Sequence, residues 1–339
     1  MRFIGSKRLL LNNIDEAIIY NIEDHQKLES FCDIFSGTAY VANYFKKKYR
    51  IISNDLLYFS YCIQNTYIKL NRTPTFSKLL KPGECIIEYL NKISDEGEGF
   101  IYKNFSPNKS SERKYLSNLN AKKIDTLRLN TENWLEKKLI NKDEYIYLIS
   151  LVIEATPFVS NIAGTYGAYL KNWDPRSKKN LKLIKPQIFN NNKKNQSFNE
   201  NSNLLIKKIS GDILYLDPPY NSRQYLPNYH LLETIAKYDN PELRGKTGLR
   251  NYENQKSDFC KKSYAEDALE DLMSNANFKY TILSYSSDGI IEETRLDRLI
   301  HKYSNKLNKK YKIPYRRYIK DKDDVKKKLY EMIYIIKNK

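Results

Sequence analysis

The sequence predicts an α/β protein with a doubly wound, mostly parallel sheet that a long insertion interrupts. Residues 31–55 have the pattern of a strand, a glycine turn, a helix and a second strand. Residues 212–216 form a continuous apolar run, which is typical of a strand buried on both faces of a parallel sheet. Between them, residues 73–195 are rich in Lys, Asn and Ser. Because parallel strands need crossover connections, strand and helix patterns that alternate along the chain favour the α/β class.

The first sheet elements are expected near the N-terminus. Residues 8–18 have a helical pattern. The apolar residues 31–35 predict a short strand that breaks at a Ser-Gly-Thr turn, and a helix is expected over residues 40–49. A second strand is expected over residues 50–54 and a further helix over residues 57–70. A strand–helix–strand unit of this kind begins a doubly wound sheet.

The insertion is expected to be mainly helical. Helical patterns occur near residues 85–93 and 144–155, and residues 163–169 predict a loop. After the insertion, strands are predicted at residues 212–216, 280–284, 310–318 and 329–336. The expected boundaries are 1–72 and 196–339 for the two parts of the sheet domain and 73–195 for the insertion.

The composition is that of a folded, basic protein. Of the 339 residues, 41% are hydrophobic, which allows a buried core and argues against wholesale disorder. The formal net charge is +18, and such a surplus attracts a polyanion such as a nucleic acid. The alternative is a coding bias toward A and T, because the chain is also rich in Asn, Ile and Tyr. No apolar run reaches the roughly eighteen residues of a membrane helix, so no membrane span is expected.

Cysteine usage argues against a disulfide framework and against a structural zinc site. The four cysteines, Cys32, Cys62, Cys85 and Cys260, lie far apart without a Cys-x-x-Cys pair, and the chain has three histidines. The N-terminal residues lack the apolar stretch of a secretory signal. Together these features predict a protein of a reducing cytoplasm.

The most specific motif is Asp217-Pro218-Pro219-Tyr220, directly after the apolar run. Two consecutive prolines cannot continue a central strand, since neither has an N–H to donate. They impose a stiff turn that holds a carboxylate and a carbonyl at the carboxyl edge of the sheet, where open α/β folds bind ligands. These acceptors could take both hydrogens of an exocyclic amine while the aromatic ring stacks on its base. The alternative is a turn whose Asp217 caps a helix and whose Tyr220 belongs to the core.

A second motif, Asp33-Ile-Phe35-Ser-Gly37, closes the first predicted strand. Glycine at a strand-to-helix turn lets a ligand approach the backbone closely. Asp55 ends the next strand, where a carboxylate can hold a ribose diol. Taken alone, the glycine motif is also typical of an ordinary turn between a strand and a helix.

The third motif is Phe3-Ile-Gly5-Ser6-Lys7, near the start of the chain. An exposed Lys7 behind a Gly-Ser turn could pair with an anionic group such as a carboxylate. The alternative is an ordinary basic N-terminal segment.

Taken in their order along the chain, the three motifs resemble those of the Dam-type (D12 class) DNA adenine-N6 methyltransferases, especially modification methylases of restriction–modification systems. The matching residues are Phe3, Gly5 and Lys7, then Asp33, Phe35 and Gly37, then Asn54 and Asp55, and finally Asp217 to Tyr220. Ser6 replaces one family glycine and Ala39 another. Asn201 is the nearest match to a family acid that contacts the adenine amine of the cofactor. The resemblance covers the sheet-forming parts, about half of the chain.

The resemblance implies a seven-stranded, Rossmann-like methyltransferase sheet with an inserted target-recognition region. It implies that no metal takes part and that S-adenosyl-L-methionine, the methyl donor, is held by Phe3, Gly5, Ser6, Lys7, Asp33, Phe35, Gly37, Asp55 and Asn201. The implied substrate is double-stranded DNA, from which an adenine is flipped to lie between Asp217, Pro218 and Tyr220. A cognate restriction endonuclease is an implied partner, a membrane is not, and a monomer or weak dimer is expected.

Three other functions stay open at this point. An RNA adenine-N6 methylase and a cytosine-N4 methylase would apply the same chemistry to a similar amine, although the Gly-Ser-Lys start and the large insertion favour DNA. A catalytically silent DNA-binding subunit would have lost the cofactor turn or the acid. Here Asp33, Gly37, Asp55 and Asp217 are all present.

Candidate DNA contacts lie in the insertion and after the tetrapeptide. Residues 164–171 resemble a Gly-aromatic-Gly loop that family members place against DNA, and residues 245–250 are expected to be a mobile basic loop. The candidate DNA-binding residues are Tyr166, Tyr169, Lys171, Arg176, Asn221, Ser222, Arg223, Tyr225, Lys246 and Arg250. The alternatives are a lid or dimerisation element for the insertion and core positions for Tyr166 and Tyr169. His230 is expected to be structural or DNA-facing rather than a general base.

Overall fold

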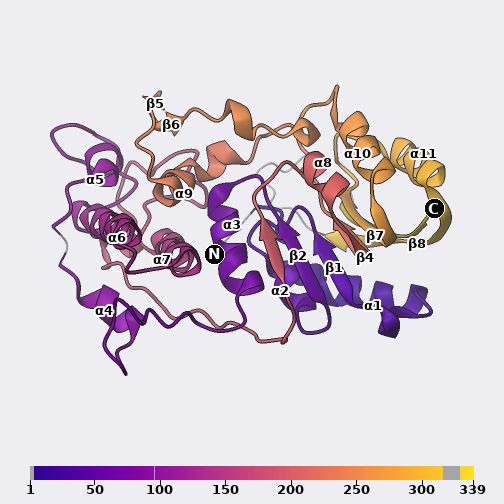
Figure 1. The fold of residues 1–339 in the computed structure, drawn as a ribbon. Coiled ribbons are helices and arrows are strands. Elements are labelled where there is room, and N and C mark those ends of the chain that lie inside the picture. Colours follow the sequence, from indigo (N-terminus) through magenta and orange to yellow (C-terminus); the bar gives the residue numbers. More distant parts are fainter. Residues whose placement is uncertain (1–3, 95, 316–328) are drawn as a thin grey trace. The chain divides into compact units, whose positions relative to one another are not determined.

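The computed structural model describes residues 4–94, 96–315 and 329–339, and the chain divides into two compact units (Figure 1). The sheet unit comprises Gly5–Leu56, Asn191–Gln224 and Lys256–Lys339. The helical unit comprises Met1–Ile4, Leu57–Asn190 and Tyr225–Gln255. The functional division at residues 72 and 195 stays a prediction.

Within the described residues, the sheet unit holds seven strands in the order β3-β2-β1-β4-β7-β9-β8. Strands β3, β2, β1, β4 and β7 run parallel, and β9 is antiparallel to both β7 and β8. The strands are β1 (Ser30–Asp33), β2 (Arg50–Asn54), β3 (Gln196–Phe198), β4 (Ser210–Leu216), β7 (Asn277–Ser286), β8 (Ser304–Tyr315) and β9 (Leu329–Asn338). The prediction of a mostly parallel, seven-stranded sheet is confirmed.

Helices cover both faces of this sheet, as in a doubly wound fold (Figure 1). Side chains alternate along a strand, so neighbouring residues of β1 enter different cores. Phe31 stacks on Phe45 of α2 with ring centroids 4.4 Å apart, whereas Cys32 joins the core formed with α10 and α11. The helices of the unit are α1 (Leu11–Asn21), α2 (Tyr40–Phe45), α8 (Ser202–Leu205), α10 (Ala265–Ser274) and α11 (Glu293–Tyr303).

The predicted strands all correspond to strands of the structure, with ends that differ by a few residues. The predicted strands near 31–35, 50–54, 212–216, 280–284, 310–318 and 329–336 match β1, β2, β4, β7, β8 and β9 in that order. Residues 316–318 lie outside the described residues. The predicted helices over 8–18 and 40–49 match α1 and the shorter α2.

The centre of the sheet positions the acidic motifs. Strand β4 lies between β1 and β7, and Asp33 is in register with Tyr215. Asp33 therefore ends β1 and Asp217 follows β4 at the same, carboxyl edge of two adjacent parallel strands. This is the edge at which open α/β sheets bind ligands.

The helical unit contains the predicted, mainly helical insertion together with a later helix. Its helices are α3 (Tyr58–Gln64), α4 (Ile86–Lys92), α5 (Phe100–Phe105), α6 (Asn118–Glu136), α7 (Lys142–Ala155) and α9 (Leu226–Lys237), and π-helical Asn65–Lys69 follows α3. Glu233 of α9 is buried and accepts the backbone N–H groups of Tyr58 and Phe59 at 3.1 and 3.0 Å. Glu233 thus supplies acceptors for N–H groups in the first turn of α3, which have no partner within the helix.

A short hairpin occupies the place of the predicted basic loop. Strands β5 (Leu243–Arg244) and β6 (Leu249–Arg250) pair antiparallel. Arg113 donates to the carbonyls of Gly245 and Lys246 at 3.1 and 3.0 Å, which ties the turn to the segment after α5. No described helix is long and apolar enough to cross a bilayer.

Candidate active site

Asp217 does not cap a helix as the alternative reading proposed; it forms a buried ion pair. Its Oδ1 lies 3.0 Å from Lys7 Nζ, and the same Nζ lies 2.9 Å from Glu331 Oε1 on β9. The side chains of Lys7 and Glu331 are 5% and 3% exposed, and that of Asp217 is 15% exposed. The ammonium group of Lys7 therefore pairs with two carboxylates at a site that is largely shielded from solvent. The expectation that Lys7 is exposed was wrong, because the lysine turns inward to these two acids.

The buried acids and lysine shift one another's protonation. Burial raises the pKa of the Asp217 carboxyl, the Lys7 ammonium lowers it, and the Glu331 charge raises it, with a net upward shift. Burial would lower the pKa of Lys7, but Asp217 and Glu331 outweigh burial and raise it well above its ordinary value. Lys7 therefore stays charged, while Asp217 is easier to protonate than an exposed aspartate.

The Tyr220 side chain lies beside this ion pair. Lys7 Nζ is 5.0 Å from the centroid of the Tyr220 ring, which favours a cation–π contact. The ring also meets Tyr285 edge-on at 6.0 Å between centroids, and the Tyr220 carbonyl accepts the N–H of Ile290 at 2.9 Å. Tyr220 is only partly buried, so the turn holds the ring in a defined place and leaves part of it accessible.

The glycine turn after β1 has the backbone geometry that the sequence predicts. Gly37 has a φ of 51°, and its N–H donates to Asp55 Oδ2 at 2.9 Å. Ala39 also has a positive φ, 63°, and precedes α2. A left-handed conformation is easier for glycine than for alanine, so this site carries some backbone strain where Ala39 replaces glycine.

Asp33 presents an unpaired carboxylate oxygen beneath that turn. The residue is 1% exposed, its Oδ2 accepts the N–H of Ala42 at 3.2 Å, and its Oδ1 has no hydrogen-bond partner. Burial raises the pKa of Asp33 to about 7, against the lowering effect of the Ser36 hydroxyl and with a further raising effect of Asp217. A buried acid with an unused oxygen favours a cationic or hydrogen-bond-donating ligand.

The remaining predicted cofactor residues lie around the same edge. The Asn54 side chain exchanges hydrogen bonds with the Glu200 backbone, which fixes the segment before α8. Asn201 is exposed and caps α8, since its side-chain oxygen accepts the N–H of Asn203 at 2.9 Å. Phe35 packs edge-on against Phe259. Gly5 has a φ of 76° and Ser6 is exposed, and Phe3 lies outside the described residues.

The predicted DNA-contact residues of the sheet unit directly follow Tyr220. Asn221 Oδ1 accepts the N–H of Arg223 at 3.0 Å, so the segment forms a compact turn. The side chains of Ser222 and Arg223 are exposed. These side chains are accessible from solvent, and their contacts with DNA stay a prediction.

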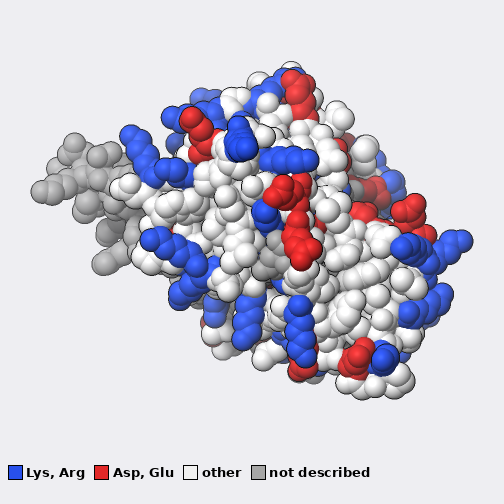
Figure 2. Space-filling model, turned by 90° about the vertical axis from the view of Figure 1, so that its left-hand side faces the viewer, with Lys and Arg blue, Asp and Glu red and all other residues white. Residues whose placement is uncertain are grey.

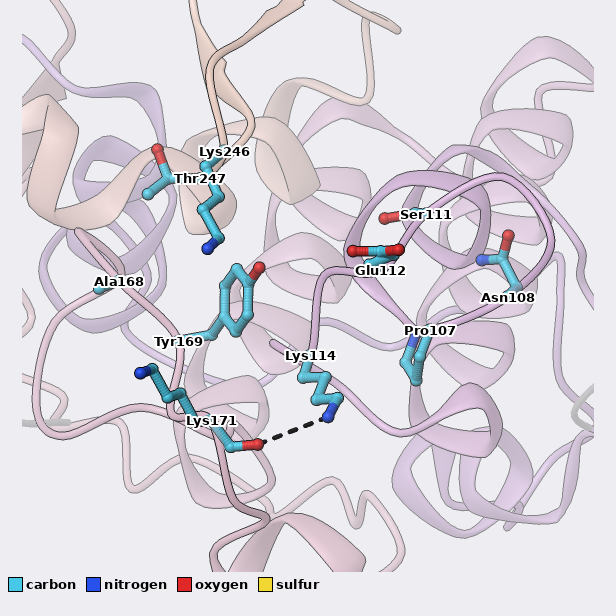
Figure 3. A pocket seen from close by; sticks show the side chains of 10 residues that line it. All are labelled: Pro107, Asn108, Ser111, Glu112, Lys114, Ala168, Tyr169, Lys171, Lys246 and Thr247. Carbon is cyan, nitrogen blue, oxygen red and sulfur yellow. Dashed lines mark hydrogen bonds between the residues drawn. The ribbon is translucent and has the colours of Figure 1, made fainter.

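In the helical unit, three lysines and a tyrosine line a hollow of about 730 Å³ (Figure 3). Lys114 and Lys171 meet on one side, where Lys114 Nζ donates to the Lys171 carbonyl at 3.5 Å, and Lys246 projects from the β5–β6 turn. The Tyr169 ring stands between Lys246 and this pair and packs edge-on against Tyr115 at 5.0 Å. The structure thus brings together the predicted Tyr169, Lys171 and Lys246, whereas Lys114 was not predicted.

Three residues predicted to contact DNA have partners within the helical unit. Tyr166 is 2% exposed, and its carbonyl lies 2.8 Å from the buried His230 ring nitrogen, so the core reading holds for this tyrosine and His230 is structural. Arg250 is 6% exposed and pairs with Asp239 at 2.6 Å. Arg176 donates to the Ile162 carbonyl and pairs with a neighbouring aspartate at 3.3 Å. These three residues have partners within the protein, and the hypothesis that they contact DNA stays a prediction.

One remaining predicted DNA contact is Tyr225 in the helical unit, and this contact stays a prediction. Tyr225 is partly buried at the start of α9 and packs against the core of the helical unit.

Figure 2 shows one face of the molecule, on which Lys and Arg side chains are widely spread and Asp and Glu side chains interrupt them near its middle. Among the described residues, no group of three or more His, Cys, Asp or Glu side chains has the arrangement of a metal site.

Sequence reasoning missed Glu331, because it lies in a predicted strand 324 residues after Lys7. The only available signal was an acid within the otherwise apolar run of residues 329–336. Such an acid, if buried, needs a partner, and the sequence does not say which lysine supplies it.

Comparison with known proteins identifies the family of the chain. Residues 3–298 match the family model of the D12 class N6 adenine-specific DNA methyltransferases. The chain is 46% identical over 342 residues to the type II methyltransferase M.FokI of Planomicrobium okeanokoites, and 43% identical over 343 residues to the modification methylase StsI of Streptococcus sanguinis. These alignments cover 99% and 100% of this chain, and 52% of each relative, so the chain spans about half the length of both.

A relative of similar length also matches. The type II methyltransferase M.NlaIII of Neisseria lactamica is 38% identical over 330 residues, which cover 96% of this chain and 94% of that protein. The family model covers both the glycine turn after β1 and the Asp217 tetrapeptide after β4. The chain therefore belongs to the D12 class of N6 adenine-specific DNA methyltransferases.

Proposed function

We propose that the chain transfers a methyl group from S-adenosyl-L-methionine to N6 of an adenine flipped out of duplex DNA. We further propose that it is the modification half of a restriction–modification system, with a restriction endonuclease as partner. The observation that carries the activity is the stiff Asp217–Tyr220 turn at the end of β4, which presents an acid and an aromatic ring at the carboxyl edge of the sheet. Membership of the D12 class and relatives described as modification methylases support the proposal.

The residues after β1 and β2 are suited to the proposed methyl donor. Asp33 Oδ1 is buried without a partner, which suits a ligand with an ammonium group, and Asp55 stands at the end of β2, where a ribose diol can bind. The positive φ of Gly37 lets a ligand approach the turn closely. When bound, S-adenosyl-L-methionine supplies a methyl group made electrophilic by its sulfonium. The proposed cofactor residues are Phe3, Gly5, Ser6, Lys7, Asp33, Phe35, Gly37, Asp55 and Asn201, and Lys7 also pairs with Asp217.

Asp217 is the proposed acceptor for the target amine. Its carboxylate and the Pro218 carbonyl accept the two amine hydrogens, which favours a pyramidal nitrogen whose lone pair can attack. The Tyr220 ring stacks on the flipped base. Catalysis then comes from alignment and from a negative charge next to the nitrogen that becomes positive. No covalent bond between enzyme and base is required.

The helical unit is the proposed site of further DNA contacts. Lys114, Lys171 and Lys246 can neutralise phosphates around the hollow, while Tyr169 offers an aromatic face to an unstacked base. Asn221, Ser222 and Arg223 are proposed contacts beside the target base. Phosphate contacts fix the register of the protein on DNA, and base contacts within the hollow would add specificity.

Methyl transfer to DNA of mixed sequence without methylated bases tests the proposal. The chain, given tritiated S-adenosyl-L-methionine, is expected to label duplex DNA, and hydrolysis should yield N6-methyladenine. Label on RNA alone would contradict the proposed substrate, and N4-methylcytosine would contradict the proposed base. Absence of both label and cofactor binding, measured by calorimetry, would favour a silent DNA-binding subunit.

A further inference from the structure

Glu331 is a second buried acid behind the active-site turn. It lies on β9, is 3% exposed, and its Oε1 is 2.9 Å from Lys7 Nζ. Ser284 of β7 donates its hydroxyl to the same oxygen at 2.6 Å. The register of the two antiparallel strands places Ser284 opposite Ile333, two residues from Glu331. Two strands therefore hold the carboxylate in place on the side of Lys7.

Charge balance in this cluster is unusual for a simple ion pair. Two carboxylates share the ammonium of Lys7, so the cluster of Asp217, Lys7 and Glu331 carries one excess negative charge when all three are ionised. An isolated buried Asp–Lys pair would hold its carboxylate firmly ionised, and that acid would be a poor proton acceptor. A second acid that pairs with the same lysine weakens the electrostatic stabilisation of the Asp217 carboxylate, because the second negative charge offsets part of the positive charge of Lys7.

We propose that Glu331 is a positioning residue that shares the ammonium of Lys7 and thereby leaves Asp217 able to accept a proton from the substrate amine. The inference rests on the proposed function and deepens it. Glu331 acts through Lys7 and need not touch the substrate. Its role differs from that of a merely structural acid, which would hold the strands together without altering the basicity of Asp217.

Methyl transfer to the amine releases one proton, and Asp217 is the proposed acceptor of that proton. The nitrogen lone pair forms the new N–C bond while the C–S bond breaks and its electron pair stays on sulfur. The methylated nitrogen then carries one proton too many and a positive charge. Asp217 takes that proton as the N–H bond breaks and later releases it to water, so that the amine is neutral and the carboxylate is restored.

Within the described part of the chain, several charged or titratable side chains surround the cluster of Asp217, Lys7 and Glu331. Lys7 meets Asp217 and Glu331 directly, and the rings of Tyr220 and Tyr215 lie near it. Asp33 at the end of β1 interacts electrostatically with Asp217, whose charge raises the pKa of Asp33. Among these groups, Glu331 contacts Lys7 without belonging to the tetrapeptide or the glycine turn. It can be changed without removing a predicted substrate contact.

The test substitutes Glu331→Gln in the full chain. The kcat for methylation of DNA of mixed sequence is measured as a function of pH for the variant and for the unaltered chain. Loss of the negative charge strengthens the hold of Lys7 on Asp217, so the acid limb of the profile should move to lower pH by about one unit. The plateau kcat should fall about tenfold, because Asp217 becomes a weaker base. The KM for DNA should stay within about twofold, since no DNA contact is removed.

The matched control is Glu293→Gln on α11. Glu293 pairs with Lys312 at 2.9 Å and also with Lys310, in the same unit but outside the cluster. Its profile should superimpose on that of the unaltered chain. Glu331→Asp, which keeps the charge on a shorter side chain, should restore part of the plateau and give a smaller shift.

An unchanged acid limb in Glu331→Gln, or one moved to higher pH, would overturn the inference. If Glu331→Gln does not fold, carbon-13 NMR compares the pKa of Asp217 in Glu331→Asp with that in the unaltered chain, and the Asp217 signal is identified by its loss in Asp217→Asn. A lower pKa of Asp217 in Glu331→Asp supports the inference, and an equal or higher pKa overturns it. If the unaltered chain methylates no nucleic acid, the proposed function fails instead, and the NMR titration still judges Glu331.

Discussion

At the scale of single residues, two buried acids share the carboxyl edge of the sheet but have different surroundings. Asp217 faces the ammonium of Lys7, whereas Asp33 has an oxygen without a hydrogen-bond partner. Burial of the Asp33 carboxyl without a full set of partners costs folding stability, and such a cost is typical of residues that bind a ligand. The contrast supports the proposed roles, in which Asp217 accepts the reacting amine and Asp33 binds the cofactor.

Asp33→Asn should weaken cofactor binding and stabilise the unliganded chain at high pH. Since the pKa of Asp33 is about 7 in the folded chain and 3.8 ordinarily, the folded state binds this proton more tightly than the unfolded state. The acid therefore costs stability increasingly as pH rises from about 4 to 7. At pH 8 the variant should gain up to about 4 kcal/mol in free energy of unfolding, because each pKa unit corresponds to about 1.4 kcal/mol.

Thermal unfolding without ligand and calorimetry with S-adenosyl-L-methionine check these two effects. Binding to the unaltered chain should weaken below about pH 7, where Asp33 takes up a proton. A variant that loses stability at pH 8 and keeps full affinity for S-adenosyl-L-methionine would contradict the assignment.

Sequence patterns reveal the site residues unevenly. Asp33, Gly37 and Asp217 stand at strand ends, where a break in an apolar run marks a turn. The inward turn of Lys7 was not predictable, because a lysine near the N-terminus is usually exposed. Its two partners lie 210 and 324 residues away, and local patterns carry no information about such contacts.

At the scale of elements, one aspartate joins the three central strands of the sheet. Asp212 of β4 accepts the N–H groups of Glu29 and Ser30 at 2.9 Å each, and pairs with Lys279 of β7 at 2.7 Å. Burial alone would raise the pKa of Asp212, but the hydrogen bonds of Lys279, Glu29 and Ser30 lower it to about 2. The ionised carboxylate therefore stabilises the sheet that positions Asp217.

Asp212→Asn should lower the free energy of unfolding by about 2 kcal/mol at pH 7. The folded pKa lies below the ordinary 3.8, so the stabilisation is complete above about pH 4 and is lost as pH falls toward 2. Urea unfolding at pH 7 and pH 2.5 measures the difference. Equal losses at both pH values would contradict the electrostatic account.

Helices were predicted less completely than strands, for a physical reason. Helix α6 (Asn118–Glu136) was missed because its buried face carries polar side chains, among them Asn120, Asp125 and Arg128. Their partners are backbone groups of other segments, such as the N–H groups of Ile101 and Tyr102 that bond Asp125. A helix that buries polar groups lacks the apolar stripe by which sequence patterns are recognised.

At the scale of the whole molecule, the net charge of +18 should govern affinity for DNA. Lys114, Lys171 and Lys246 come from three separate segments and meet at one hollow. Replacing all three by alanine should weaken DNA binding and reduce the slope of log K against log salt by about two to three units. The loss should be similar for DNA with and without a target site, since phosphate contacts carry no sequence information.

The control removes the same charge from the sheet unit, where each lysine chosen pairs with an acid. Its three positions are Lys27, Lys208 and Lys302. This variant should change the slope by less than about one unit. Equal changes in both variants would mean that the hollow has no special part in DNA binding.

The most direct test of the account is the activity of Asp217→Asn, which keeps the shape of the side chain and removes its charge. Adenines should be methylated in DNA from cells that express the unaltered chain, and sequencing would map them. In the variant, methyl transfer should fall at least about 100-fold, while the S-adenosyl-L-methionine dissociation constant stays within a fewfold. Full methylation by Asp217→Asn would contradict the claim that this carboxylate, held at the end of β4, acts on the substrate amine.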